Sequence, residues 1–335
     1  MQKPTLVISG RLVLKKNVLL APLAGITDFP FRRTARMCGA ELVFTEMISS
    51  NGLVFRNKKT LSMVSTLKDE QPVGVQIFGS NPEIMAEAAI ICQELGATLI
   101  DINMGCPQKK IVKTGAGAAL MLDPALAQGI VGQVARKVSV PVTCKIRLGW
   151  DSQSINSPSF AKRMEDAGAS MITVHGRTRS QMFAGKADWE AIARVKKAVS
   201  IPVVANGDIF SAEDAKRCLH ITKADGIMVG RAAMGRPWII GVISDQIDPG
   251  KEQNIPNVRE RLRIILFHLD AIREFYEQGV ALKIARKHLA WYTKGMRNSA
   301  AFRDALFRTK NLDELEGLTC SFFKRMLQNR DDISS

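Results

Sequence analysis

Residues 97–117, ATLIDINMGCPQKKIVKTGAG, combine the pattern of a buried strand with a turn that carries a thiol. The apolar start of the segment stops at Asp101, as expected where a buried parallel strand ends. Gly105 permits a sharp turn, and Pro107 has no backbone N–H with which to continue a ladder of hydrogen bonds. The segment therefore predicts that Cys106 lies on a turn at the carboxyl end of a strand.

Two interpretations of Cys106 follow from its neighbours. Lys109, Lys110 and Lys113 come directly after it, and nearby positive charge lowers the pKa of a thiol and attracts anions. Alternatively, Cys106 is an inert buried residue beside solvated lysines. The segment alone leaves both open, so the rest of the chain has to distinguish them.

Short β-rich runs like the one in this segment recur along the chain. There are eight: 18–22, 42–47, 73–78, 99–103, 142–147, 171–175, 203–206 and 226–229. Amphipathic segments of helical period separate them, at 30–38, 82–95, 124–138, 159–167, 189–199 and 212–219. Helix-start signals such as Asn81-Pro82 and Asp123-Pro124 open several of these segments. Eight strands alternating with helices predict a closed parallel (β/α)8 TIM barrel, preceded by a short hairpin over residues 6–14.

The pattern changes after the eighth strand. Residues 244–256 are polar and contain Pro249-Gly250, which predicts a linker. From Val258 onward the apolar spacing is helical, and no β-rich run is present. The chain is therefore expected to consist of a barrel domain, residues 1–243, and a smaller all-helical domain, residues 244–335.

The charge balance favours a polyanionic partner. Lys and Arg outnumber Asp and Glu by 47 to 32, and the sequence pI is about 9.7. Between Lys283 and Lys310 there are eight basic residues and one acidic residue, Asp304. Arg286-Lys287-His288, followed by Trp291-Tyr292, suits contact with phosphates and with bases or ribose. A solvated helix face with a core Trp is the alternative.

Other classes of protein are disfavoured by composition. No apolar run approaches the ~18 residues of a membrane-spanning helix, and the N-terminus lacks the order of a signal peptide. A cytoplasmic protein without membrane contact is expected. Six scattered cysteines without a CxxC pair, and only four histidines, argue against a structural metal site or a disulfide framework.

Active sites of TIM barrels lie at the carboxyl ends of the strands, and polar residues collect there in this sequence. They are Glu46, Gln76, Asn103, Cys106, Lys145, Arg147, His175, Arg177, Arg179, Asn206, Asp208 and Arg231. Asn206-Gly207-Asp208 and Gly230-Arg231 follow the last two strands, where such barrels bind phosphate. Their glycines allow close approach of backbone N–H groups, and Arg231 adds a guanidinium. A phosphate-bearing ligand is predicted, with two ordinary glycine turns as the alternative.

Lys145 has two possible roles on this pattern. It could form a Schiff base, as in an aldolase, or lie as a fixed charge beside a cofactor ring. Arg147 is two residues further along the same strand and so points to the same side. It would crowd Lys145 electrostatically or orient an anion.

Several motifs, in chain order, resemble those of the tRNA-dihydrouridine synthases. They are APLAGITD (21–28) with PFR (30–32), VQIFGS (75–80), DINMGCPQKK (101–110), KIRLGW (145–150), HGRTR (175–179), NGDI (206–209), GRAAMGRPW (230–238) and RKHLAWY (286–292). The resemblance covers nearly the whole chain, and NMGCP is its most specific part. It is strongest to the bacterial B-type subgroup.

The resemblance implies a cytoplasmic enzyme that uses FMN, with NADPH as reductant, to reduce the 5,6 double bond of a D-loop uridine in tRNA, at position 17. It implies hydride transfer to C6 and protonation of C5 by Cys106. Residues at the cofactor would be Pro22, Leu23, Ala24, Gln76, Lys145, His175, Asn206, Gly207, Asp208, Gly230 and Arg231. Residues at the substrate would be Asn103, Arg147, Lys109, Lys110, Arg177, Arg179, Arg286 and Lys287. The helical domain would bind tRNA, and no metal or protein partner is implied.

This chemistry constrains Cys106. Hydride addition at C6 of uracil leaves enolate-like charge, which an acid near C5 and donors near O4 stabilise. As an acid, Cys106 has to remain a protonated thiol, so Lys109 and Lys110 are expected to point away from it, toward phosphates. The uridine has to leave its stack to reach the site.

Three alternatives remain. An FMN-dependent TIM-barrel dehydrogenase acting on a free pyrimidine would share the barrel but needs no basic helical domain. A Schiff-base aldolase would use Lys145 covalently. A non-catalytic RNA-binding protein would not need Cys106.

Overall fold

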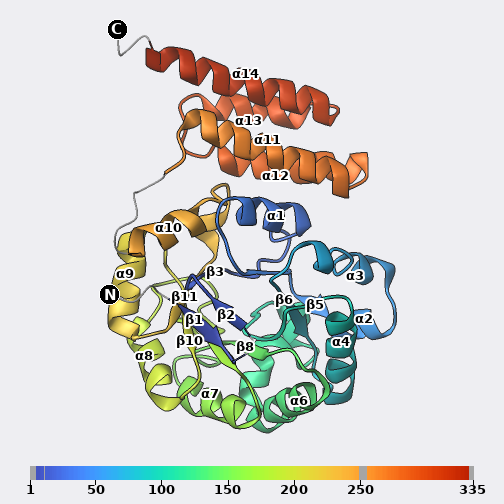
Figure 1. Cartoon of the computed structure of the whole chain (residues 1–335), viewed down its shortest axis with the longest axis vertical. Helices are drawn as coiled ribbons and strands as arrows, with labels where there is room; N and C mark the ends of the chain where they lie inside the picture. The colour runs from blue at the N-terminus through green and yellow to red at the C-terminus, as the bar shows by residue number, and fades with distance from the viewer. Residues whose placement is uncertain (1–4, 11, 249–254, 332–335) are drawn as a thin grey trace.

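The computed structural model describes residues 5–10, 12–248 and 255–331. Parallel strands form one sheet that curves around a central axis, with helices outside it (Figure 1). The strands are β3 (Val18–Leu20), β4 (Val43–Phe44), β5 (Ile48–Ser49), β6 (Val73–Phe78), β7 (Leu99–Met104), β8 (Val142–Arg147), β9 (Met171–His175), β10 (Val203–Asn206) and β11 (Gly226–Val229). Their order is β3-β11-β10-β9-β8-β7-β6-β4, with β5 also on β6. The predicted TIM barrel is confirmed. It is nearly closed, since within the described residues no hydrogen bond pairs β3 with β4.

The second barrel strand differs from the prediction. The sequence predicts one strand over 42–47, but the structure divides it into β4 and β5, both parallel to β6. Thr45 interrupts the ladder because its hydroxyl accepts from the Gln76 N–H (3.1 Å) and donates to the Glu46 carbonyl (2.8 Å). The break brings Glu46 and Met47 to the carboxyl end of the barrel.

The helices of the barrel follow the predicted alternation. They are α1 (Phe29–Met37), α2 (Ser50–Val54), α3 (Lys58–Ser62), α4 (Pro82–Glu94), α5 (Lys109–Val112), α6 (Pro124–Lys137), α7 (Ser157–Asp166), α8 (Trp189–Ala198), α9 (Ala212–Thr222) and α10 (Ile239–Ile247), with 3-10 helices η1 (Leu67–Asp69), η2 (Gly117–Leu122) and η3 (Arg231–Ala233). The start signals at Asn81 and Asp123 act as caps, as do Asp188 and Ser211: each of these side chains accepts a backbone N–H of the first turn.

The amino end of the barrel is closed by the predicted hairpin. Strands β1 (Leu6–Ile8) and β2 (Leu12–Leu14) pair antiparallel. Leu6, Ile8 and Leu14 are fully or almost fully buried and pack with interior residues such as Leu19 and Met228. Since this end is filled by apolar side chains, the carboxyl end is the one available for ligands.

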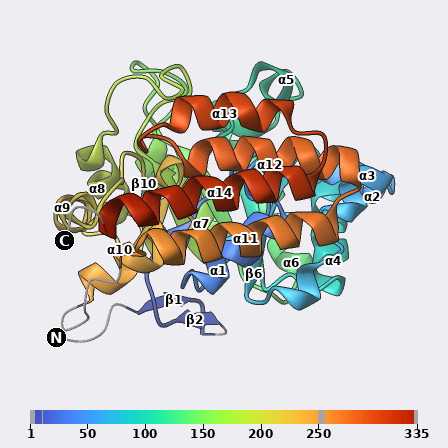
Figure 2. The ribbon, with the colours of Figure 1, turned by 90° about the horizontal axis from the view of Figure 1, so that it is seen from above.

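The helical domain contains α11 (Val258–Phe275), α12 (Gln278–Tyr292), α13 (Ser299–Arg308) and α14 (Leu312–Asp331), which share a separate apolar core. It lies on the side of the barrel formed by α1 and α10 (Figure 1), and Figure 2, seen from that side, shows its helices in front of the barrel. The predicted linker start is wrong, because α10 continues through Ile247. Ile240 and Ile243 of α10 are fully buried and extend the barrel core to this point. Residues 249–254 of that linker lie outside the described residues.

Side chains near the start of α1 hold the two domains together. The Tyr276 hydroxyl donates to the Asp28 carboxylate (3.0 Å), and Arg33 pairs with Glu274 (2.6 Å). The His288 ring stacks on Phe31 with centroids 5.5 Å apart. The β3–α1 segment is thereby tied to the helical domain. Among the described helices, none is both long enough and apolar enough to cross a bilayer.

Candidate active site

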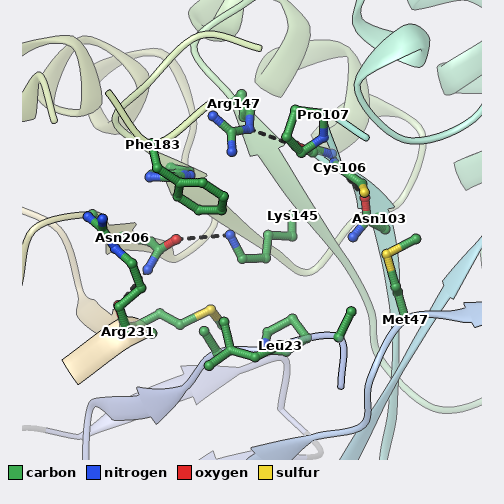
Figure 3. A pocket seen from close by; sticks show the side chains of 18 of the residues that line it. Leu23, Met47, Asn103, Cys106, Pro107, Lys145, Arg147, Phe183, Asn206 and Arg231 are labelled. Atoms are coloured by element: carbon green, nitrogen blue, oxygen red, sulfur yellow. Dashed lines mark hydrogen bonds between the residues drawn. The ribbon is translucent and has the colours of Figure 1, made fainter. Parts of the chain in front are cut away.

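A pocket of about 450 Å³ opens at the carboxyl end of the barrel (Figure 3). Its lining comes from segments far apart in the chain: Ala21–Ala24, Ile26, Met47, Gln76, Asn103, Gly105–Gln108, Lys145, Arg147, His175, Phe183, Asn206–Phe210, Met228, Gly230, Arg231 and Met234. Every residue predicted at the cofactor is in this set, together with Cys106, Asn103 and Arg147. The structure thus brings together the residues of the predicted catalytic centre.

The Cys106 turn is held by the side chain of Asn103. The Asn103 Oδ1 atom accepts the backbone N–H groups of Gly105 (3.2 Å) and Cys106 (2.9 Å). On the other side of the turn, the Nε atom of Arg147 donates to the Gly105 carbonyl (2.7 Å). Both contacts fix the backbone, so the position of the thiol is set by β7 and β8.

The Cys106 thiol is protonated at neutral pH. Burial raises its pKa above the usual range, while a hydrogen bond to the backbone of Gln108 and the charges of Arg147 and Lys110 oppose the rise without reversing it. Lys109 and Lys110 are exposed on α5 and do not line the pocket. The interpretation of Cys106 as an acid fits this environment better than a thiolate nucleophile does.

Lys145 and Arg147 are adjacent inward-facing cations on β8. The Lys145 Nζ donates to Asn206 Oδ1 (3.0 Å), as Figure 3 shows. Burial, together with the charge of Arg147 and against the opposing charge of Asp101, lowers the pKa of Lys145 to about 8. Arg147 donates from Nη1 to the carbonyls of Thr178 (2.8 Å) and Met182 (2.9 Å). The two cations of the pocket wall are therefore held in place by hydrogen bonds to other groups of the protein.

His175 lines the pocket as a neutral imidazole. Burial, followed by the charges of Lys145, Arg147, Arg177 and Arg231, holds its pKa far below the ordinary value. A neutral ring offers a ligand one donor and one acceptor.

The loops after β10 and β11 fit an anion. The Asp208 carboxylate accepts from Arg177 (2.7 Å), Arg231 (3.0 Å) and the Ala187 N–H (2.8 Å). These contacts tie the loops after β10 and β11 to the β9–α8 loop. In the described part of the chain, the backbone N–H groups of Gly207, Asp208, Gly230 and Arg231 donate no hydrogen bond. A Cβ on Gly230 would meet nothing closer than 3.7 Å, so its backbone is open to the pocket. Four spare donors at this place are what a phosphate group needs.

Two predicted substrate residues have other partners. Arg177 is buried and donates to the carbonyls of Ala184 (3.0 Å) and Gly185 (2.6 Å) as well as to Asp208, so it organises the β9–α8 loop. The Arg179 guanidinium lies 4.4 Å from the centre of the Trp150 ring. Neither side chain lines the pocket.

The two predicted tRNA contacts on α12 are also bonded within the protein. Arg286 donates to the Thr309 carbonyl, and Lys287 donates to the carbonyl of Gly25 in the β3–α1 segment. The Gly25 N–H donates in turn to the carboxylate of Glu46. Lys287 therefore connects the helical domain to a segment that lines the pocket.

Sequence reasoning did not single out Asp101 or Phe183 as site residues. Asp101 is completely buried among the barrel strands, and an acidic residue within an apolar strand pattern was a usable signal. Met47, which the sequence places with Glu46 at the end of the second strand, lines the pocket. Phe183 stands on the β9–α8 loop, about half exposed, with its ring 5.9 Å from the Arg147 guanidinium. No local pattern in that loop predicts its direction.

Comparisons with known proteins identify the family. Residues 19–328 match the family model described as "Dihydrouridine synthase (Dus)". The chain is 45% identical over 298 residues to a probable tRNA-dihydrouridine synthase of Rickettsia bellii, covering 89% of this chain and 91% of the relative. It is 42% identical over 326 residues to tRNA-dihydrouridine synthase B of Pasteurella multocida, covering 96% and 97%.

A solved structure shares the fold alone. Histamine dehydrogenase from Rhizobium sp. 4-9 is 13% identical and superposes with a TM-score of 0.56, over 80% of this chain and 50% of that one. The sequence matches extend through both domains, and the predicted resemblance to the B-type subgroup is confirmed by relatives of that name. The chain belongs to the dihydrouridine synthase family.

Proposed function

We propose that this protein is a flavin-dependent tRNA-dihydrouridine synthase that reduces the 5,6 double bond of a D-loop uridine, at position 17, with NADPH as reductant. The observation that carries the proposal is the combination, in one pocket, of a protonated thiol and two loops with spare backbone donors. The family and its tRNA-modifying relatives support the substrate class.

The pocket fits FMN. The spare N–H groups after β10 and β11, with Arg231, would hold the phosphate. Gln76, Lys145 and His175 would face the polar edge of the ring, and backbone groups of Pro22–Ala24 would contact it. When bound, FMN supplies the hydride that the reaction delivers to C6 of the uracil.

Cys106 donates the proton that completes the reaction. Its thiol has a raised pKa and lies on a turn fixed by Asn103 and Arg147, so it is both protonated and positioned. Proton transfer from Sγ to C5 neutralises the enolate-like charge that follows hydride addition. The resulting thiolate is stabilised by the nearby Arg147 guanidinium and regains its proton from solvent, because Cys106 is only partly buried.

Asn103 and Arg147 orient the base. One N–H of the Asn103 amide is bonded to Gln76, which leaves the other for a uracil carbonyl. In the part of the chain that the structure describes, Arg147 Nη2 donates no hydrogen bond, so it adds donors on the same wall. The partly exposed Phe183 ring offers a surface on which an unstacked base can pack.

The helical domain is proposed to bind tRNA through its exposed basic residues. Lys283, Lys294, Arg297, Arg308 and Lys310 are exposed on or beside α12 and α13, whereas Arg286 and Lys287 are partly buried. Lys109 and Lys110, exposed on α5, are proposed to extend this phosphate-binding surface to the barrel. Arg177 and Arg179 are proposed to act by shaping the loop beside the base.

A single-turnover experiment tests the function. The flavin of the purified holoenzyme is reduced with NADPH without oxygen, and tRNA lacking dihydrouridine is added while the flavin spectrum is followed. Rapid reoxidation and dihydrouridine mapped by nucleoside mass spectrometry to position 17 are expected. A reduced flavin that tRNA does not reoxidise overturns the proposal.

The same assay separates the alternatives. Reoxidation by free uracil, or reduction by dihydroorotate, would favour a dehydrogenase of small pyrimidines. A substrate trapped on Lys145 by borohydride would favour an aldolase. Full function after Cys106→Ala would favour a non-catalytic RNA-binding protein.

A further inference from the structure

A completely buried carboxylate lies one layer below the proposed active site. Asp101 on β7 is paired in register with Gln76 on β6 and with Thr143 on β8. Its Oδ2 atom accepts from Gln76 Nε2 (2.6 Å), and its Oδ1 atom accepts from the Thr143 hydroxyl (2.6 Å). A buried carboxylate is costly unless such contacts satisfy it, and an apolar side chain would carry no such cost.

The contacts of Asp101 continue to the Cys106 turn without a gap. The Gln76 Oε1 atom, whose amide is bonded to Asp101, accepts from Asn103 Nδ2 (2.7 Å). Asn103 Oδ1 then accepts the N–H groups of Gly105 and Cys106. Gln76 is 1% and Asn103 7% exposed, so contact of either amide with water is confined to the side that faces the pocket.

The two ends of this chain determine how both amides are turned. A carboxylate only accepts hydrogen bonds, so Gln76 has to present its NH2 group to Asp101 and its oxygen to Asn103. Asn103 then presents its NH2 group to Gln76 and its oxygen to the backbone N–H groups of the turn. Turning either amide by 180° would place donor against donor and acceptor against acceptor.

We propose that Asp101 is a positioning residue: it fixes the orientation of the Gln76 and Asn103 amides, and through them the Cys106 turn. With this orientation, each amide keeps one unused N–H beside the pocket that both residues line. The wall therefore offers donors, which suit the carbonyl oxygens of a pyrimidine or a flavin. The suitability for those ligands rests on the proposed function, whereas the orientation itself does not.

Hydrogen–deuterium exchange tests the orientation without substrate. The N–H groups of Gly105 and Cys106 are followed by fragment-level mass spectrometry in the holoenzyme and in Asp101→Leu, which keeps the branching at Cγ but accepts no hydrogen bond. Without Asp101 the two amides are held only from the side of the turn, so the contact of Asn103 with the turn is weakened, and exchange at these two N–H groups is expected to be about tenfold faster. Asp101→Asn, which retains one acceptor oxygen, is expected to be intermediate.

Thr173→Val is the matched control. Thr173 is a buried residue on β9, and its hydroxyl has no partner in the described part of the chain. Its replacement changes a barrel-interior side chain but leaves the path from Asp101 to Cys106 intact, so wild-type exchange is expected. Circular dichroism and thermal melting show which variants are folded.

Two results would overturn the proposal. One is wild-type exchange at Gly105 and Cys106 in folded Asp101→Leu; if that variant does not fold, wild-type exchange in Asp101→Asn has the same meaning. The other is equal acceleration in Thr173→Val.

Turnover with tRNA provides a second readout. In Asp101→Leu, kcat is expected to fall about 100-fold with little change in KM, because the thiol and donors are displaced after the substrate has bound. If exchange is faster in Asp101→Leu but the wild-type protein has no activity on tRNA, the proposed function is rejected and the positioning role is retained.

Discussion

The barrel mouth and the helical domain are both basic, but their charges serve different purposes. At the mouth, Lys145 and Arg147 point inward, make hydrogen bonds with protein acceptors and have lowered pKa values. On the helical domain, Lys294 and Arg297 are exposed beside the α12–α13 turn. Charges buried with fixed partners can act at defined atoms of a ligand, whereas solvated charges contribute attraction that salt screens.

Lys287 lies between these two classes. It belongs to α12 and to the basic segment, yet its ammonium group is bonded to Gly25 at the barrel mouth. A cluster of basic residues in sequence is therefore not a uniform binding surface in space. The contrast leads to four predictions, in order of expected effect.

The largest effect is expected from removing the acid. Cys106→Ala should lower dihydrouridine formation by about 100-fold or more, because alanine has no proton to donate to C5. Flavin content and tRNA affinity should stay at wild-type values in absorbance and filter-binding measurements. Cys320→Ala, on α14, is the control and should leave all three unchanged. Equal loss of flavin from Cys106→Ala would indicate a structural role instead.

The next effect concerns pH. If the Lys145 ammonium is needed, the reoxidation rate of reduced flavin by tRNA should fall as pH rises through about 8, because the buried amine loses its proton there. The Cys106 thiol, with its raised pKa, stays protonated in this range. Lys145→Arg should move the alkaline fall to higher pH, and Lys145→Met should be slow at every pH. An unchanged profile in Lys145→Arg would assign the fall to another group.

A smaller effect is expected on the helical domain. Lys294→Ala combined with Arg297→Ala should weaken tRNA binding several-fold and reduce its salt dependence by about one ion per lost phosphate contact. Flavin reduction by NADPH should not change. Lys162→Ala, which removes an exposed cation on α7 of the barrel, is the control. Equal weakening in that control would show that binding follows net charge rather than this surface.

The smallest effect is expected from Lys287→Met. Loss of its contact with Gly25 should change flavin affinity by roughly a factor of two to five, since one partly exposed hydrogen bond contributes about 0.5–1 kcal/mol. A role as a phosphate contact would instead weaken tRNA binding and leave flavin affinity unchanged. Flavin titration of the apoenzyme and tRNA binding by the holoenzyme separate the two roles.

The sequence by itself determined the barrel and most of the residues at its mouth. Periodic apolar runs set the strands, and alternation with helices set a parallel topology whose carboxyl ends must share one rim. Cys106, Lys145, Asn206 and Gly230 could be placed there because each lies at a strand end or within two residues of one. Their convergence required no knowledge of side-chain contacts.

Tertiary structure decided what each charge bonds to. Arg177 is as prominent in sequence as Arg147, but it is turned into the β9–α8 loop, where carbonyls and Asp208 satisfy it. The contact between Lys287 and Gly25 spans 262 residues, and the chain from Asp101 to Cys106 passes through another strand at Gln76. Hydrogen bonds act over about 3 Å, so partners distant in sequence are chosen only when packing brings their atoms together.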